Sequence, residues 1–464
     1  MTRWLAAGLG LIVAAAAVLL ALDGTLNQTS RHDATVAAAL HPGHDAARSG
    51  AHTRTTTTST ATTPTTPTLT PERLHPTGPA ATHLRRALDR ALAPAGPHVS
   101  VLVFDLSTHT ELYGVHAGVS RPPASVEKLW TTTALMDRLG PHTRLHTTIL
   151  GTGHERHGVW HGNLYLRGGG DPTFGDAQFN SVWNHGEGST STALVAGLRR
   201  RGIRKVTGRV YADESLFDRR RGGLITHYKP DIPDFGGQLS ALTYDHGTTL
   251  RGYTPATFAV HEVVLTMRDE HIAATAARHA RKTPRAAREL ASVASPTMQA
   301  MVRLMDVPSD DFFAELFAKQ LGVLFGKGGT ISDGARVIAR TIADDYALHP
   351  TILDGSGLGR ADRTSPVQIV DLLRDLWRTH VGRELTRALP TVGVNGTVAG
   401  IADHTAAARH CVAKTGSLDY VTNLAGYCGA RRGQELAFGI FLDGPDNAEG
   451  FALEGQMVAA IARY

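Results

Sequence analysis

The sequence predicts an α/β domain that is split by a β-rich insert over residues 146–295. Three observations predict this arrangement. Helical apolar spacing alternates with strand-like segments over residues 81–145, and the same alternation returns over residues 296–464. Between these two parts, strand-like segments and glycine-rich turns dominate, over a length that suits a separate domain. The two outer parts are therefore expected to fold together as one domain.

The first outer part is expected to contain a helix, two strands and a second helix. Residues 82–94 carry apolar side chains at helical spacing, namely Leu84, Leu88 and Leu92. Residues 98–117 predict two strands around a turn at Ser107 and Thr108. The second helix, over residues 125–140, follows two prolines and stops before Pro141.

The insert and the second outer part continue the pattern. Residues 163–174 predict a strand that runs into a glycine-rich turn, and residues 201–213 and 261–267 predict further strands. Helical spacing returns after residue 295. The predicted elements there are helices over 295–322 and 365–378, strands within 410–416, 423–430 and 435–443, and a last helix over 454–464.

The chain before residue 81 is expected to lie outside the folded domains. Residues 4–22 form an uncharged apolar run, and at about 1.5 Å per residue they would span roughly 28 Å, close to a bilayer core. Residues 1–24 are therefore predicted to be a transmembrane anchor, with a cleaved signal peptide as the alternative. Residues 25–80 are predicted to be a disordered tether, because 12 of the 20 residues over 51–70 are threonine. Both alternatives for residues 1–24 place the rest of the chain outside the cytoplasm, in the cell envelope.

Composition and motif content exclude several functions. The formal net charge is +5, but the basic residues are scattered and lack interleaved aromatic residues, which argues against a nucleic-acid partner. The sequence has no G-x-S-x-G motif, no H-E-x-x-H zinc motif and no P-loop. The glycine-rich stretch 355–359 lacks the strand and helix of a dinucleotide-binding loop, and a turn is the better prediction.

What remains is a serine and a lysine three residues apart. Ser125 and Lys128 would lie on one face of the predicted helix. A serine hydroxyl needs a base to act as a nucleophile, and a lysine amine can take its proton. Taken alone, the pair fits an ordinary surface helix better than a catalytic site.

Two later motifs add to this pair. Lys414, Thr415 and Gly416 end a predicted strand, where the lysine and the hydroxyl can hold a carboxylate and the glycine lets a ligand approach. The alternative is a plain strand that ends in a glycine turn. Ser309 and Asp311 precede a helical run, and the alternative there is a helix cap made by Ser309 or Asp310.

Taken in order, the three motifs resemble those of penicillin-binding proteins and serine β-lactamases. Segments such as GNLYLRGGGDPTF, PSDDFFAELFAKQLG, LDGSGLGRADRTSP, GVNGTVAGI and AKTGSLDYVTNLAGY are similar to the D-alanyl-D-alanine carboxypeptidase/endopeptidase family, the class C low-molecular-mass penicillin-binding proteins. The resemblance covers about residues 82–464. It implies a penicillin-binding or β-lactamase-like transpeptidase fold, with an antiparallel sheet flanked by helices and an insert between the first two motifs.

The resemblance also implies an activity and roles for these residues. It implies a serine peptidase that acts on peptidoglycan stem peptides and binds β-lactams, with no metal and no cofactor. The implied nucleophile is Ser125, its base is Lys128, and Ser309 passes a proton to the leaving amine. The implied carboxylate site is formed by Lys414, Thr415 and Ser417 beside Gly416, and the backbone N–H groups of Ser125 and Ser417 would form the oxyanion hole.

Asp311 departs from the family, whose second motif ends in asparagine. An amide can donate and accept hydrogen bonds, whereas an ionised carboxylate can only accept them. An ionised Asp311 beside Lys128 would favour the protonated amine and weaken it as a base, and a protonated Asp311 would keep a donor. Asp311 is still expected in the substrate-binding group. Two alternative functions stay open: a β-lactamase or esterase of the same fold, and a non-catalytic wall-binding protein, which Asp311 favours.

Cys411 and Cys428 are the two cysteines of the chain. In a hairpin centred between Asp419 and Tyr420, the numbers of opposed residues add up to 839, and those of the two cysteines do so as well. The cysteines would then face each other across two strands. This register predicts a cross-strand disulfide, unless a bulge in the turn shifts the pairing.

Overall fold

The computed structural model describes residues 78–230 and 236–464. The predicted anchor over residues 1–24 lies outside the described residues, as does the predicted tether up to residue 77. In the described part of the chain, no helix is long and apolar enough to cross a membrane. The first described helix is α2 (Pro79–Leu92), which begins two residues before the predicted start of the folded part.

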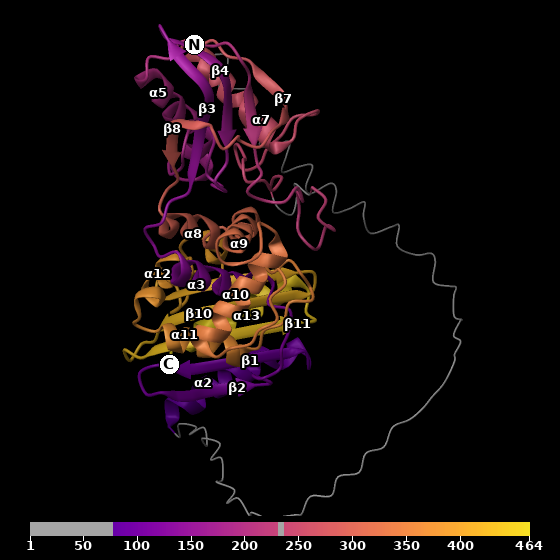
Figure 1. The fold of residues 1–464 in the computed structure, drawn as a ribbon. Helices are drawn as coiled ribbons and strands as arrows, with labels where there is room; N and C mark the ends of the chain where they lie inside the picture. Colours follow the sequence, from indigo (N-terminus) through magenta and orange to yellow (C-terminus); the bar gives the residue numbers. More distant parts are fainter. Residues whose placement is uncertain (1–77, 231–235) are drawn as a thin grey trace, which may run out of the picture. The chain divides into compact units, whose positions relative to one another are not determined.

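A five-stranded antiparallel sheet joins the two outer parts of the chain (Figure 1). Its strand order is β2-β1-β11-β10-β9, so strands from the first outer part pair with strands near the C-terminus. The strands are β1 (Val99–Asp105), β2 (Thr110–Val115), β9 (Cys411–Leu418), β10 (Val421–Gly429) and β11 (Glu435–Asp443). This confirms the predicted antiparallel sheet shared by both outer parts.

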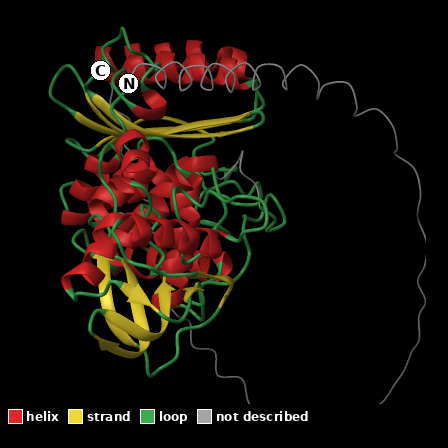
Figure 2. Cartoon of the chain, turned by 90° about the horizontal axis from the view of Figure 1, so that it is seen from above, coloured by secondary structure: helices red, strands yellow, loops and turns green. Residues whose placement is uncertain are grey.

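Helices cover both faces of this sheet (Figure 2). Strand residues alternate between two cores: Val101 and Val103 pack with α2 and α13 (Asn447–Ala462), whereas Leu102 packs with the opposite layer of helices. The opposite layer contains α3 (Lys128–Arg138), α8 (Met298–Asp306), α9 (Asp311–Phe325), α10 (Ile331–Tyr346), α11 (Pro366–Leu376) and α12 (His380–Ala388). Three short 3₁₀ helices complete this part: η2 (Ala93–Ala95), η3 (Ala124–Glu127) and η4 (Gly396–Val398). The flanking helices confirm the predicted fold class.

A second sheet is built within the predicted insert. Its order is β7-β6-β4-β3-β8, and β5 also pairs with β4. The strands are β3 (His146–Arg156), β4 (Val159–Arg167), β5 (Lys205–Val206), β6 (Val210–Asp213), β7 (Ala276–Ala280) and β8 (Arg288–Ala294). The helices are α4 (Ala177–Trp183), α5 (Ser191–Arg200) and α7 (Pro255–Asp269). Every strand of this sheet lies within residues 146–295, while the division into separate domains stays a prediction.

The strand predicted over residues 261–267 is wrong, because these residues belong to helix α7. Thr254 caps the helix in a capping box, and Pro255 occupies its first turn. The buried residues Val260, Val263 and Met267 recur at helical spacing, so they form one helix face against the sheet. The three successive apolar residues 263–265 resemble a buried strand, so the helical spacing is not evident within residues 261–267 alone.

The hairpin of β9 and β10 has the predicted register. Leu418 pairs with Val421, and Cys411 pairs with Cys428 at the far end of the two strands. The structure joins these two cysteines in a disulfide, with their Cα atoms 4.0 Å apart. The predicted cross-strand disulfide is therefore confirmed, and it lies on the strand that carries the third motif.

Candidate active site

Ser125 and Lys128 lie where the 3₁₀ helix η3 runs into α3. Ala124, just before the serine, has a φ of 47°, a left-handed conformation that costs free energy in a residue with a side chain. Asn423 on β10 holds this entry in place, because its amide donates to the carbonyl groups of Pro122 (2.9 Å) and Pro123 (2.8 Å). The serine therefore sits on a turn whose shape is set by a neighbouring strand.

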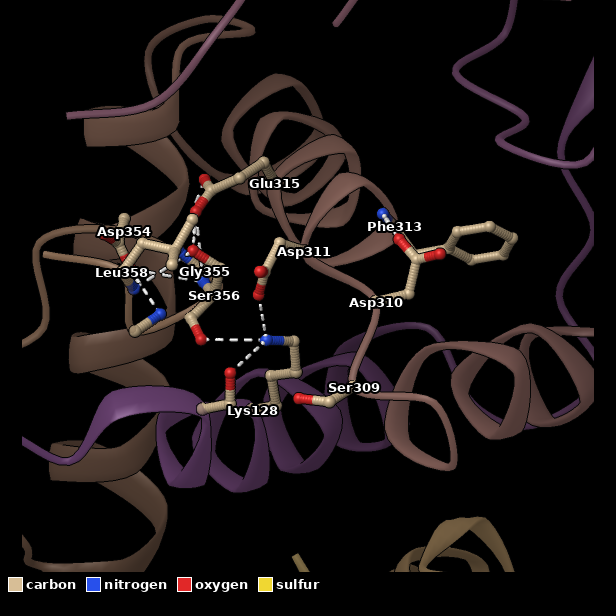
Figure 3. A network of polar contacts seen from close by, with 12 residues as sticks. Lys128, Ser309, Asp310, Asp311, Phe313, Glu315, Asp354, Gly355, Ser356 and Leu358 are labelled. Atoms are coloured by element: carbon tan, nitrogen blue, oxygen red, sulfur yellow. Dashed lines mark hydrogen bonds and ion pairs between the residues drawn. The ribbon is translucent and has the colours of Figure 1, made fainter. Parts of the chain in front are cut away.

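Lys128 is fully buried, and its amine has three partners (Figure 3). Nζ lies 2.9 Å from the hydroxyl oxygen of Ser125, 2.5 Å from Oδ1 of Asp311 and 2.9 Å from the carbonyl oxygen of Ser356. The predicted pair is therefore within the reach that proton transfer from a serine to a base requires. The contact to Asp311 is the ion pair expected for an ionised carboxylate beside Lys128.

Asp310 and Asp311 take different roles at the start of helix α9. Asp310 is the N-cap: its carboxylate accepts from the backbone N–H of Phe313 at 2.9 Å. His246 of the insert contacts the same carboxylate at 2.8 Å. Since Asp310 supplies the cap, Asp311 is free to face Lys128. Burial raises the pKa of Asp311, and the neighbouring charge of Lys128 only partly offsets this.

Ser309 faces the lysine of the third motif. Its φ of 65° is also left-handed, and its hydroxyl oxygen accepts a hydrogen bond from Nζ of Lys414 at 2.7 Å. Lys414 is fully buried and also donates to the carbonyl oxygen of Thr415 at 3.0 Å. Burial, followed by the charge of Lys128, lowers the pKa of Lys414 to about 7. Lys414 thus stands behind the site surface, where it orients Ser309.

The third motif runs along the outer edge of the sheet, on strand β9. A Cβ atom on Gly416 would lie 2.5 Å from the carbonyl oxygen of Pro123 and 3.1 Å from the backbone nitrogen of Ser125, so only glycine allows this approach. Ala413 donates its N–H outward to Pro390 at 3.1 Å, and backbone groups alternate sides along a strand. The N–H of Ser417 therefore points to the same free edge.

These residues surround one cavity of about 400 Å³. Of the predicted site residues, it is lined by Ser125, Ser309, Asp311, Thr415 and Ser417. Lys128 and Lys414 lie buried behind its wall, and Gly416 packs against the turn that carries the serine. The structure thus brings together all eight predicted residues from three separate segments.

Two further residues line the cavity that the sequence motifs did not predict as site residues. Thr397 on η4 accepts a hydrogen bond from the hydroxyl of Thr415 at 2.7 Å, and Phe451 lies at the start of α13. Thr397 lies in the segment GVNGTVAGI, which had already shown a family resemblance. Phe451 has no such signal, because an isolated aromatic residue in a helix predicts only packing.

Asp306, at the end of α8, was also missed. Its carboxylate accepts from the hydroxyl of Thr132 at 2.7 Å and is fully buried. Burial raises the pKa of Asp306 to about 7, and the nearby charge of Lys414 partly offsets this shift. Three buried titratable groups of the site, Asp306, Asp311 and Lys414, thus have a raised or lowered pKa, a pattern typical of catalytic centres.

Comparison with known proteins gives a family match over most of the chain. The sequence model of the D-Ala-D-Ala carboxypeptidase 3 (S13) family matches residues 84–256 and 234–464. A D-alanyl-D-alanine carboxypeptidase of Actinomadura sp. (strain R39) is 25% identical over 479 aligned positions, which cover 84% of this chain and 86% of that protein. The carboxypeptidase DacB of Mycolicibacterium smegmatis is 28% identical over 387 positions, covering 78% of this chain and 81% of that protein.

The fold is also similar to a solved structure. Penicillin binding protein 4 (dacB) of Haemophilus influenzae superposes with a TM-score of 0.67 at 18% identity, covering 81% of this chain and 99% of that one. A second structure of the same protein, in complex with a β-lactam, gives a TM-score of 0.64. At this identity the likeness concerns the fold.

Proposed function

The chain belongs to the D-Ala-D-Ala carboxypeptidase 3 (S13) family of serine peptidases, and we propose that it cleaves peptidoglycan stem peptides through an acyl-enzyme on Ser125. The same serine would be acylated by penicillins. One observation carries the proposal: Nζ of Lys128 lies 2.9 Å from the hydroxyl of Ser125, at the wall of a cavity shared with Ser309 and Thr415. A nucleophile and its base are thus placed beside groups that can bind a peptide end.

In the acylation step, Ser125 attacks the carbonyl carbon between the two D-alanine residues. The hydroxyl proton passes to Nζ of Lys128 as the new carbon–oxygen bond forms. The carbonyl oxygen becomes an oxyanion, for which the N–H groups of Ser125 and Ser417 are the proposed donors, since strand β9 presents its free edge there. Both donors belong to backbone held by the close contact of Gly416 with the serine turn.

The intermediate then collapses and the carbon–nitrogen bond breaks. The proton that Lys128 took from Ser125 passes to the leaving amine of the terminal D-alanine through the hydroxyl of Ser309, which Lys414 orients at 2.7 Å, so Lys128 is neutral again. Water next attacks the ester on Ser125, and Lys128 can accept a proton from it. The products are the shortened peptide acid and the free serine.

The terminal carboxylate of the substrate is proposed to bind beside β9. Thr415 and Ser417 face the cavity and offer hydroxyl groups, while buried Lys414 contributes its charge from behind. Thr397 holds the Thr415 hydroxyl and so shares in this subsite. Cleavage of peptide cross-links is a second proposed activity, because it also places a carboxylate beside a D-centre next to the scissile bond.

The enzyme is proposed to work outside the cytoplasm, at the cell wall. This rests on the uncharged run from Trp4 to Leu22, which would serve as an anchor or as a cleaved signal. The threonine-rich stretch that follows would let the folded part reach into the wall.

Labelling with a fluorescent penicillin tests the proposal. The wild-type protein should carry a covalent label that survives denaturation, and the Ser125→Ala variant should carry none. A folded wild type that takes no label would contradict the proposal and favour the non-catalytic wall-binding alternative. Label that is lost within seconds, with hydrolysed penicillin accumulating over many turnovers, would instead indicate a β-lactamase.

A further inference from the structure

The glycine-rich turn over residues 354–359 lies directly against the serine turn. Gly357 has a φ of 84°, and a Cβ atom there would collide with the carbonyl oxygen of Ala124. The turn contains two successive peptide units that face helix α3. Each unit is held at both ends, with a carboxylate on its N–H and a side chain of α3 on its carbonyl.

The first peptide unit joins Gly355 to Ser356. Its carbonyl oxygen accepts a hydrogen bond from the hydroxyl of Thr131 on α3 at 2.8 Å. Its N–H, on Ser356, points the opposite way and lies 3.1 Å from Oε1 of Glu315 and 3.2 Å from Oδ1 of Asp354. Because a trans peptide is planar, fixing the N–H also fixes the direction of the carbonyl.

The second peptide unit joins Ser356 to Gly357 and reaches the catalytic lysine. Its carbonyl oxygen accepts from Nζ of Lys128 at 2.9 Å, and its N–H donates to Oδ1 of Asp354 at 2.7 Å. Oδ2 of the same carboxylate accepts from the N–H of Gly359 at 2.9 Å, and Asp354 is buried. Asp354 therefore holds the N–H end of the Ser356–Gly357 peptide unit, and Lys128 donates to the carbonyl end of the same unit.

The carbonyl of Ser356 decides how the amine of Lys128 is turned. A neutral amine has two hydrogens and one lone pair, and Asp311 and the Ser356 carbonyl are both acceptors. When the two hydrogens point at these acceptors, the lone pair is left facing the third neighbour, the hydroxyl of Ser125. Without the Ser356 carbonyl, the amine can rotate and present a hydrogen to Ser125 in place of its lone pair.

We propose that Asp354 is a positioning residue for the base Lys128, acting through the Ser356–Gly357 peptide unit. Its carboxylate keeps the Ser356 carbonyl aimed at Nζ, so that the lone pair faces Ser125. The role needs an acceptor at the position of Oδ1, and an asparagine can supply it. This inference rests on the proposed function and deepens it.

Asp362 offers a matched control in the same segment. It is also a fully buried carboxyl, and its Oδ1 accepts from the N–H of Leu353 at 2.7 Å. It makes no hydrogen bond to either peptide unit that faces α3. Equal substitutions at the two positions therefore separate an effect on Lys128 from a general loss of loop stability.

The test measures acylation by a chromogenic β-lactam in a stopped-flow instrument, which separates the dissociation constant of the initial complex from the acylation rate constant. Asp354→Ala should lower the acylation rate constant by about 10- to 100-fold and leave the dissociation constant unchanged within about twofold. Asp354→Asn keeps the acceptor for the Gly357 N–H but turns an N–H₂ group toward the N–H of Gly359, so it should recover at least half of the loss in the logarithm of the rate constant. Asp362→Ala and Asp362→Asn should leave the rate constant close to that of the wild type.

Equal losses of rate at positions 354 and 362, or a wild-type rate in Asp354→Ala, would overturn the inference. If Asp354→Ala does not fold, Asp354→Glu takes its place with Asp362→Glu as its control, since the longer side chain moves the acceptor off the Gly357 N–H. Asp354→Glu should then show the loss of about 10- to 100-fold in acylation rate, and Asp362→Glu should not. A wild type that is never acylated would refute the proposed function itself, which is a different result from variants that acylate normally.

Discussion

Replacing Asp311 by asparagine should accelerate acylation of Ser125. In the structure, Oδ1 of Asp311 lies 2.5 Å from Nζ of Lys128, and only 17% of the aspartate side chain is exposed. The carboxylate therefore stabilises the ammonium form of Lys128, which cannot accept the serine proton. An asparagine oxygen can accept the same hydrogen bond without the negative charge, and its N–H₂ group adds a donor for a substrate carbonyl.

The size of the effect follows from the geometry. At 2.5 Å and an effective dielectric constant of about 20, the attraction between the two charges is roughly 7 kcal/mol before desolvation is subtracted. A hydrogen bond to a charged group contributes about 1.5–3 kcal/mol net. Since about 1.4 kcal/mol corresponds to a factor of ten, removing the negative charge beside Lys128 in Asp311→Asn should raise the acylation rate by about 10- to 100-fold.

The assay is the acylation rate of a chromogenic β-lactam at several pH values. The advantage of Asp311→Asn should shrink as the pH falls, because burial raises the pKa of Asp311 and protonation of this carboxylate removes the charge that distinguishes the wild type from the variant. Asp310→Asn is the matched control: it changes the neighbouring carboxylate, which caps helix α9 and contacts His246 but does not touch Lys128. Asparagine caps helices as well as aspartate does, so this control should acylate at the wild-type rate. An Asp311→Asn variant slower than the wild type at every pH would refute the reasoning.

Three further predictions concern other parts of the site. Gly416→Ala should lower acylation by about tenfold or more, because its Cβ would lie 2.5 Å from the Pro123 carbonyl; Gly429→Ala, whose nearest neighbour would be 3.6 Å away, should have little effect. Burial, with the charge of Lys128, lowers the pKa of Lys414 to about 7, so this lysine loses its charge as the pH rises through that value. KM for a peptide with a free terminal carboxylate should then rise, and a KM that stays flat from pH 6 to 8 would count against the carboxylate site. Native protein should show no titratable thiol, and replacing both cysteines by serine should lower the free energy of unfolding by about 3 kcal/mol, because the disulfide spans 17 residues; a titration that finds two thiols would contradict this.

Local patterns predicted the parts of the molecule that local forces determine. The register of the β9–β10 hairpin follows from its turn, so the pairing of Cys411 with Cys428 could be derived from residue numbers alone. The spacing of Ser125 and Lys128 placed both on one helical entry, and their contact depends on only three residues of chain. The strand predicted over residues 261–267 failed because a capped helix and a buried strand share the same short apolar run.

Long-range contacts were beyond such patterns. Phe451 reaches the cavity from the last helix, and Asp354 reaches Lys128 through a peptide unit of a turn that predicted no chemistry. Both depend on packing between segments that are hundreds of residues apart in the chain. For Asp311, the residue type alone indicated a departure from the family, and the structure adds the distance that gives it a magnitude.

Release of D-alanine tests the central claim most directly. A peptide that ends in D-alanyl-D-alanine, incubated with the folded wild-type protein, should yield one free D-alanine per cleaved peptide. The Ser125→Ala variant should release none above the rate without enzyme, while keeping the wild-type melting temperature within a few degrees. Equal release by both proteins, or none from a folded wild type across pH 5 to 9, would contradict the account.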